Sequence, residues 1–180
     1  MTIGAAFMVF FGAIWMALGI YAGRTLPTWL RSVVLVIGLA LTLWVSLAAR
    51  TAISASRNAP PETAQERAAG RQIGRRFGLI FGLEGGAIFI LILTLNALHR
   101  PAAILAGIAI IVGLHFFPLA ALFGRPLYYA TGTIGCGIGV IALMMPDTPI
   151  RNSFTGLSFG TLLWVTAAIV LARFPQITVR

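Results

Sequence analysis

Long apolar runs alternate with short polar breaks along this chain. Six runs are each long enough to cross a hydrocarbon core of about 30 Å as a helix. They cover residues 3–23, 29–49, 77–98, 102–123, 127–145 and 154–172. Arginine and proline mark most of the breaks between them. The pattern therefore predicts an all-α polytopic membrane protein with six transmembrane helices in a single membrane domain.

The composition agrees with this interpretation. The 180 residues are 59% hydrophobic and 9% charged, and the mean hydropathy is +0.96. So few polar residues cannot cover a soluble protein of this size. The net charge of +9 raises the question of nucleic acid, but the basic residues lie between the apolar runs, as loop charges of a multi-pass protein do. We expect a membrane protein that binds no nucleic acid.

The one long polar segment is 50–76, and it contains six of the 13 basic residues. After Pro60 and Pro61 it begins with acids and continues with arginines, the charge order that a helix dipole favours. We expect a cytoplasmic loop with a short basic helix that can run directly into the span at 77–98. Anionic lipid headgroups are the expected partners of four arginines there, and a docking or regulatory surface is the alternative. These are Arg67, Arg71, Arg75 and Arg76.

Arginine positions also predict the topology. An even number of spans places both termini on one side of the membrane, together with segment 50–76. That side holds nine arginines, namely six in 50–76 and Arg125, Arg173 and Arg180, against four on the other side, Arg24, Arg31, Arg100 and Arg151. The positive-inside rule then places both termini in the cytoplasm. Enrichment in Arg, Ala and Gly is typical of a GC-rich bacterial genome, so we expect a bacterial inner membrane.

An internal repeat is a further expectation. The string Gly-Leu-Ile-Phe-Gly at 78–82 resembles Gly-Leu-Ser-Phe-Gly at 156–160, three spans later. A Gly-Arg pair also follows a glycine at the same distance in the first and fourth spans, at 23–24 and 124–125. Because three spans invert the second unit, these matches suggest a weak 3+3 inverted repeat, an architecture of many transporters.

Glu84 is the one ionisable residue of the span at 77–98, and His115 is its counterpart in the next span. A carboxylate in the middle of a bilayer costs about 2.5 to 3.5 kcal/mol on insertion scales. The turn between the two spans is short, so they should be antiparallel neighbours, with the two residues about 10 and 12 Å from the same end. We expect the pair to be in contact, either as a proton, ion or substrate site or as a purely structural pair.

Pro118 follows His115 by three residues. Because proline has no amide hydrogen, it frees the carbonyl of Leu114 and tends to kink the helix. A break of this kind in a membrane helix is tolerated where neighbours or water satisfy the freed group. Pro118 is therefore included in the candidate site.

Glycines with regular spacing predict close helix packing. They are Gly78, Gly82 and Gly86, opposite Glu84, and Gly135 and Gly139 in the span at 127–145. The last two offer a surface on which two copies could meet, and we expect a homodimer or larger oligomer. Secondary polar candidates, which interhelical hydrogen bonds would explain, are Asn96, Ser158 and Thr161.

Motifs of common enzymes are missing from the sequence. It contains no His-Glu-x-x-His, Gly-x-Ser-x-Gly, phosphate-binding loop or Cys-x-x-Cys motif. We therefore expect no metal and no cofactor, and an enzyme is the least supported class. The working hypothesis is a small transporter or channel for a proton, ion or small solute. The alternative is a non-catalytic scaffold or accessory subunit that binds partners through its glycine-rich helices.

Overall fold

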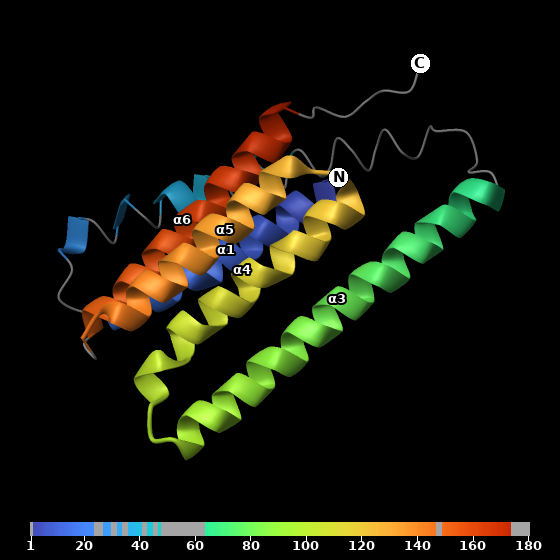
Figure 1. The fold of residues 1–180 in the computed structure, drawn as a ribbon. Coiled ribbons are helices and arrows are strands. Elements are labelled where there is room, and N and C mark those ends of the chain that lie inside the picture. Colours follow the sequence, from blue (N-terminus) through green and yellow to red (C-terminus); the bar gives the residue numbers. More distant parts are fainter. Residues whose placement is uncertain are drawn as a thin grey trace. The chain divides into compact units, whose positions relative to one another are not determined.

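The computed structural model describes residues 2–23, 27–29, 32–33, 36–40, 43–44, 47, 64–146 and 149–173. Its long helices are α1 (Thr2–Ala22), α3 (Ala64–Ala97), α4 (Ile104–Phe123), α5 (Pro126–Met144) and α6 (Pro149–Arg173). A short 3₁₀ helix, η1 (Pro101–Ala103), precedes α4. Every regular element in these ranges is helical (Figure 1). The predicted all-α class is confirmed.

Five helices in the described ranges are long and apolar enough to cross a membrane. They correspond to the expected spans at 3–23, 77–98, 102–123, 127–145 and 154–172. Ten of the 21 residues of the expected span at 29–49 lie outside the described residues, and the other eleven are helical. The segment 50–63, Asp147 and the tail from 174 onward lie entirely outside the described residues.

Two helices begin earlier than the hydropathy pattern predicts. Helix α3 is continuous over 34 residues, so the expected short basic helix is its first part and not a separate element. Helix α6 begins at Pro149 and not at 154. Proline is favourable at a helix start because its missing amide hydrogen has no partner there anyway. In addition, Nη2 of Arg151 donates a hydrogen bond to the carbonyl of Met145, which ties the start of α6 to the end of α5.

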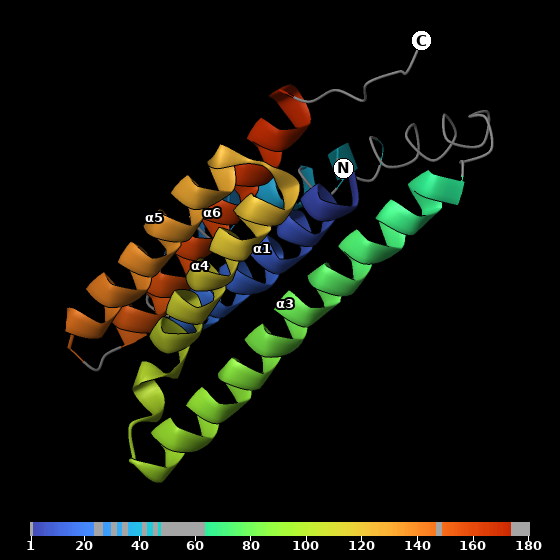
Figure 2. The same cartoon turned by 45° about the vertical axis from the view of Figure 1, so that its right-hand side comes forward.

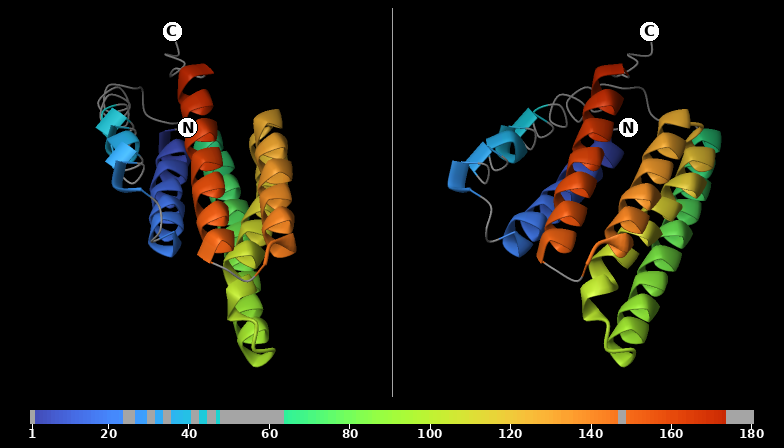
Figure 3. Two further views of the ribbon diagram at one scale, coloured as in Figure 1. Left: turned by 90° about the vertical axis from the view of Figure 1, so that its left-hand side faces the viewer. Right: turned by 60° about the vertical axis from the view of Figure 1, so that its left-hand side comes forward.

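The chain divides into two compact units, one of Met1–Ala59 with Gly156–Arg180 and one of Pro60–Thr155. In the first unit α1 packs on the C-terminal part of α6, as the blue and red helices of Figure 3 show. A Cβ at Gly19 would lie 2.6 Å from the amide nitrogen of Leu157, so the two backbones nearly touch. Trp164 adds a hydrogen bond from Nε1 to the carbonyl of Val9, 3.2 Å long. Small residues thus allow close contact here, as they do between membrane helices in general.

The second unit contains α3, η1, α4, α5 and the first turns of α6. Helices α3 and α4 are antiparallel neighbours joined by a tight turn, which Figure 2 shows at the foot of the green helix. The turn ends α3 with His99 in the left-handed region (φ 53°). The amide of Arg100 donates to the carbonyl of Leu95 (2.8 Å) and that of His99 to Asn96 (3.0 Å). This is the Schellman pattern, which satisfies the last carbonyls of a helix.

Helices α4 and α5 pack through glycine. A Cβ at Gly113 would lie 2.6 Å from the amide nitrogen of Cys136, and one at Gly139 would lie 2.8 Å from the carbonyl oxygen of Ala106. Cys136 Sγ also donates to the carbonyl of Ile110 over 3.6 Å. The Gly135-x3-Gly139 spacing therefore serves contact within the protomer. This differs from the expectation of an intermolecular surface, because both glycines are buried against α4.

The two strings of the expected repeat have different surroundings. Gly156 and Gly160 pack against α1, whereas a Cβ at Gly78 or Gly82 would meet no described atom within 4 Å. The inverted repeat itself stays a prediction.

Candidate functional site

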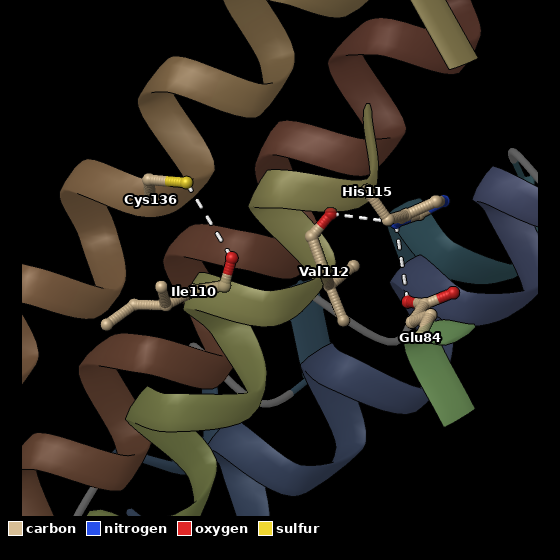
Figure 4. A network of polar contacts seen from close by, with 5 residues as sticks. All are labelled: Glu84, Ile110, Val112, His115 and Cys136. Atoms are coloured by element: carbon tan, nitrogen blue, oxygen red, sulfur yellow. Dashed lines mark hydrogen bonds and ion pairs between the residues drawn. The ribbon is translucent and has the colours of Figure 1, made fainter. Parts of the chain in front are cut away.

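Glu84 on α3 and His115 on α4 face each other. The distance between Glu84 Oε1 and His115 Nδ1 is 3.3 Å, and each side chain is 10% exposed. Figure 4 shows the carboxylate beside the imidazole edge. The structure thus brings together the two residues that the sequence singled out, and their functional role stays a prediction.

The register of the two helices explains this contact. The short turn at His99 and Arg100 makes α3 and α4 antiparallel, and the ring centroids of Phe77 and Phe123 lie 6.2 Å apart. Glu84 follows Phe77 by seven residues, and His115 precedes Phe123 by eight. At 1.5 Å per residue both are therefore about 10 to 12 Å from that shared level.

A second contact of His115 determines where its ring carries hydrogen. Nδ1 lies 2.8 Å from the carbonyl oxygen of Val112. A carbonyl oxygen only accepts hydrogen bonds, so a contact this short places a hydrogen on Nδ1. This hydrogen bond is to Val112, and the 3.3 Å contact of Nδ1 with Glu84 Oε1 is an ion-pair contact. Nε2 lies on the far side of the ring in Figure 4 and is the position at which the ring takes up a second proton.

Aromatic rings surround the imidazole. Its centroid lies 4.7 Å from that of Phe116 and 5.6 Å from that of Phe81. Phe81 in turn lies 4.8 Å from Phe77, and Phe116 lies 5.9 Å from Tyr128. These rings lie between the Glu84–His115 pair and the end of the second unit at which Phe77 and Phe123 meet. They provide an apolar surrounding, in which an unpaired charge would be costly.

Pro118 lies inside α4 and is exposed. Position 118 cannot donate to the carbonyl of Leu114, because proline lacks the amide hydrogen. The structure places this break within one turn of His115. Pro118 therefore contributes to the candidate site at most by leaving the carbonyl of Leu114 without its usual helical hydrogen bond.

Two of the secondary polar candidates bond within their own helices. Asn96 Nδ2 donates to the carbonyl of Ile92 (2.8 Å) and Thr161 Oγ1 to that of Leu157 (2.7 Å), each within its own helix. Ser158 lies on α6 in the other unit. Local bonds of this kind satisfy a hydroxyl or amide without any interhelical partner.

Sequence reasoning missed one group of buried polar residues at the start of α6. Arg151, Ser153 and Thr155 are 7%, 6% and 0% exposed, whereas the hydropathy pattern predicts that the last span begins only at 154. Thr155 Oγ1 donates to the carbonyl of Arg151 over 2.8 Å. The signal that could have located them is Pro149, which marks an earlier helix start.

Residues able to hold a metal do not cluster within the described ranges: no group of three or more His, Cys, Asp or Glu side chains comes together there. No protein-family model matches the chain, and no curated protein or solved structure is significantly similar to it. Fold and site alone therefore define the class: an all-α chain of membrane-spanning-type helices that carries a carboxylate–imidazole pair between two of them.

Proposed function

We propose that this protein is a small transporter or channel for a proton, an ion or a small solute, with Glu84 and His115 at its site. The observation that supports this is the 3.3 Å contact between the two side chains, about 10 to 12 Å from the same end of their apolar helices. Ionisable residues at such positions are costly, and in membrane proteins they mark ion and proton pathways by default.

The proton is the substrate that these two groups can handle directly. A proton bound at Nε2 leaves the imidazole doubly protonated, and the hydrogen on Nδ1 can then pass to Glu84 Oε1. The ring is neutral again, now protonated at Nε2, and the carboxylate has become a carboxylic acid. Release from Glu84 and return of the ring to its Nδ1–H form complete one transfer across the pair.

The test is proton flux into liposomes that contain the purified protein, followed with an enclosed pH-sensitive dye under an imposed membrane potential. Glu84→Gln removes the titratable group and keeps the shape, so we expect flux to fall about a hundredfold or more, the scale on which positioned acid–base groups act. Glu66→Gln makes the same change in the N-terminal turn of α3 and should leave flux unaltered. Equal flux through wild type and Glu84→Gln would remove Glu84 from any transport mechanism.

A non-catalytic scaffold or accessory subunit is the second candidate. It is favoured by the glycines of α3, since a Cβ at Gly78, Gly82 or Gly86 would meet no described atom within 4 Å. Such a face suits close contact with another membrane helix. A scaffold should bury Glu84 without water and show no flux, whereas Gly82→Leu should change the size of the complex in detergent.

We place the protein in the inner membrane of a bacterium, with both termini in the cytoplasm. Support comes from the nine-to-four distribution of arginines between the two sides. The four exposed arginines of α3 would then face the cytoplasmic leaflet.

A further inference from the structure

The arginines at the start of α3 lie in a row along one continuous helix. Arg67, Arg71 and Arg75 are four residues apart on a continuous helix, with Arg76 directly after them. All four side chains are exposed. Because the helix continues without interruption to Ala97, the height of each guanidinium group relative to the apolar part of α3 is set by the helical rise.

That height matches the lipid headgroups. The apolar part of α3, residues 77–97, is about 31 Å long at 1.5 Å per residue, which matches a hydrocarbon core of about 30 Å. Arg75 and Arg76 therefore lie where the hydrocarbon ends. Arg71 lies about 9 Å beyond Phe77, within the headgroup region of a bilayer.

Aromatic side chains mark the same level independently. The centroid of Phe123 lies 6.2 Å from that of Phe77 and 6.4 Å from that of Tyr128. These contacts place the turn that contains Arg125, between α4 and α5, at the same end of the unit as Arg75 and Arg76. Tyrosine at this level is typical of a membrane interface.

We propose that this end of the second unit, the basic end formed by Arg71, Arg75, Arg76 and Arg125, binds the phosphate groups of anionic lipids. Guanidinium groups form paired hydrogen bonds with phosphate oxygens, and the long side chains let the charge reach the headgroups from the edge of the hydrocarbon. Among the described residues of the second unit, the opposite end has two arginines, Arg100 and the buried Arg151. The surface is continuous with apolar helix faces, which suits a bilayer better than a soluble nucleic acid.

The test uses the full chain with Cys136→Ala and Ala68→Cys, labelled with a fluorophore and placed in nanodiscs. Ala68 is exposed on α3 between the arginines. The fluorescence is quenched with headgroup-spin-labelled phosphatidylglycerol or phosphatidylcholine. We expect half-maximal quenching at a lower mole fraction of spin-labelled phosphatidylglycerol than of spin-labelled phosphatidylcholine. Each arginine near the surface contributes about 1 kcal/mol, so Arg71→Gln or Arg75→Gln should reduce this preference about fivefold.

Two variants control for charge and chemistry. Arg100→Gln removes the same charge at the opposite end and should leave the preference unchanged. Arg71→Lys with Arg75→Lys should retain most of the preference, because the attraction to the leaflet depends mainly on charge. The double variant Arg71→Gln with Arg75→Gln should lose most of the preference for phosphatidylglycerol.

Four results would overturn the proposal. Equal quenching by the two lipids would exclude selective binding, and an equal effect of Arg100→Gln would show that only net charge matters. Displacement of phosphatidylglycerol by inorganic phosphate beyond the effect of sodium chloride at the same ionic strength would indicate a site for free phosphate. Tight binding of a labelled RNA to the protein in phosphatidylcholine nanodiscs would likewise replace lipid with nucleic acid as the partner.

Discussion

At the residue scale, we predict that the Glu84–His115 contact makes a buried acid tolerable. In an apolar surrounding, attraction between the two groups is stronger than in water, and either group alone is expensive. His115 also bonds to the carbonyl of Val112 (2.8 Å), which orients the ring toward α3. Each partner is therefore expected to depend on the other.

A double-mutant cycle measures this dependence. Glu84→Gln, His115→Phe and their combination are compared by thermal unfolding in detergent. We expect each single change to destabilise the protein more than the combined change does, with a coupling energy of about 0.5 to 2 kcal/mol. Glu84→Gln combined with Asn96→Ala, about 18 Å farther along α3, should be additive. Additivity in the Glu84–His115 cycle as well would mean that each residue has its own partner.

At the element scale, glycines of the same helix differ in how closely they pack against the neighbouring helix. A Cβ at Gly139 of α5 would lie 2.5 Å from Ile110 Cγ1 and 2.8 Å from the carbonyl oxygen of Ala106, whereas one at Gly137 would meet no described atom within 4 Å. Of these two positions, only Gly139 brings α5 close to α4. Glycine spacing along the sequence does not distinguish the two.

This contrast makes a matched pair of substitutions. Gly139→Ala should destabilise the protein by about 1 to 3 kcal/mol, because a backbone oxygen on α4 must move to admit the methyl group. Gly137→Ala should be neutral or slightly stabilising, since alanine favours the helix. Thermal unfolding in detergent measures both changes. Equal effects of the two variants would contradict the packing described for α4 and α5.

At the scale of the whole molecule, we predict the membrane topology from the distribution of charge. Nine of the 13 arginines lie on the side that we assign to the cytoplasm. Single cysteines introduced after residues 65 and 180, with Cys136→Ala, should therefore react with a membrane-impermeant thiol reagent only after the cells are opened. Labelling of either position in intact cells would reverse the orientation or change the number of spans.

The sequence by itself determined the class of protein, the approximate course of five helices and the candidate pair. These depend on local composition, because hydropathy over some 20 residues decides whether a segment can enter a bilayer. The equal depth of Glu84 and His115 also followed from counting residues, since a short turn leaves antiparallel helices little freedom of register.

Only the tertiary structure decided which faces of the helices are used. Gly135-x3-Gly139 packs within the protomer while the glycines of α3 stay open, although both patterns have the same spacing. The start of α6 carries a bond between Arg151 and Met145 that joins it to the end of α5, and the hydrogen on His115 Nδ1 depends on the position of Val112. Such features arise from which atoms meet in three dimensions, and periodicity along one helix contains no information about the neighbour.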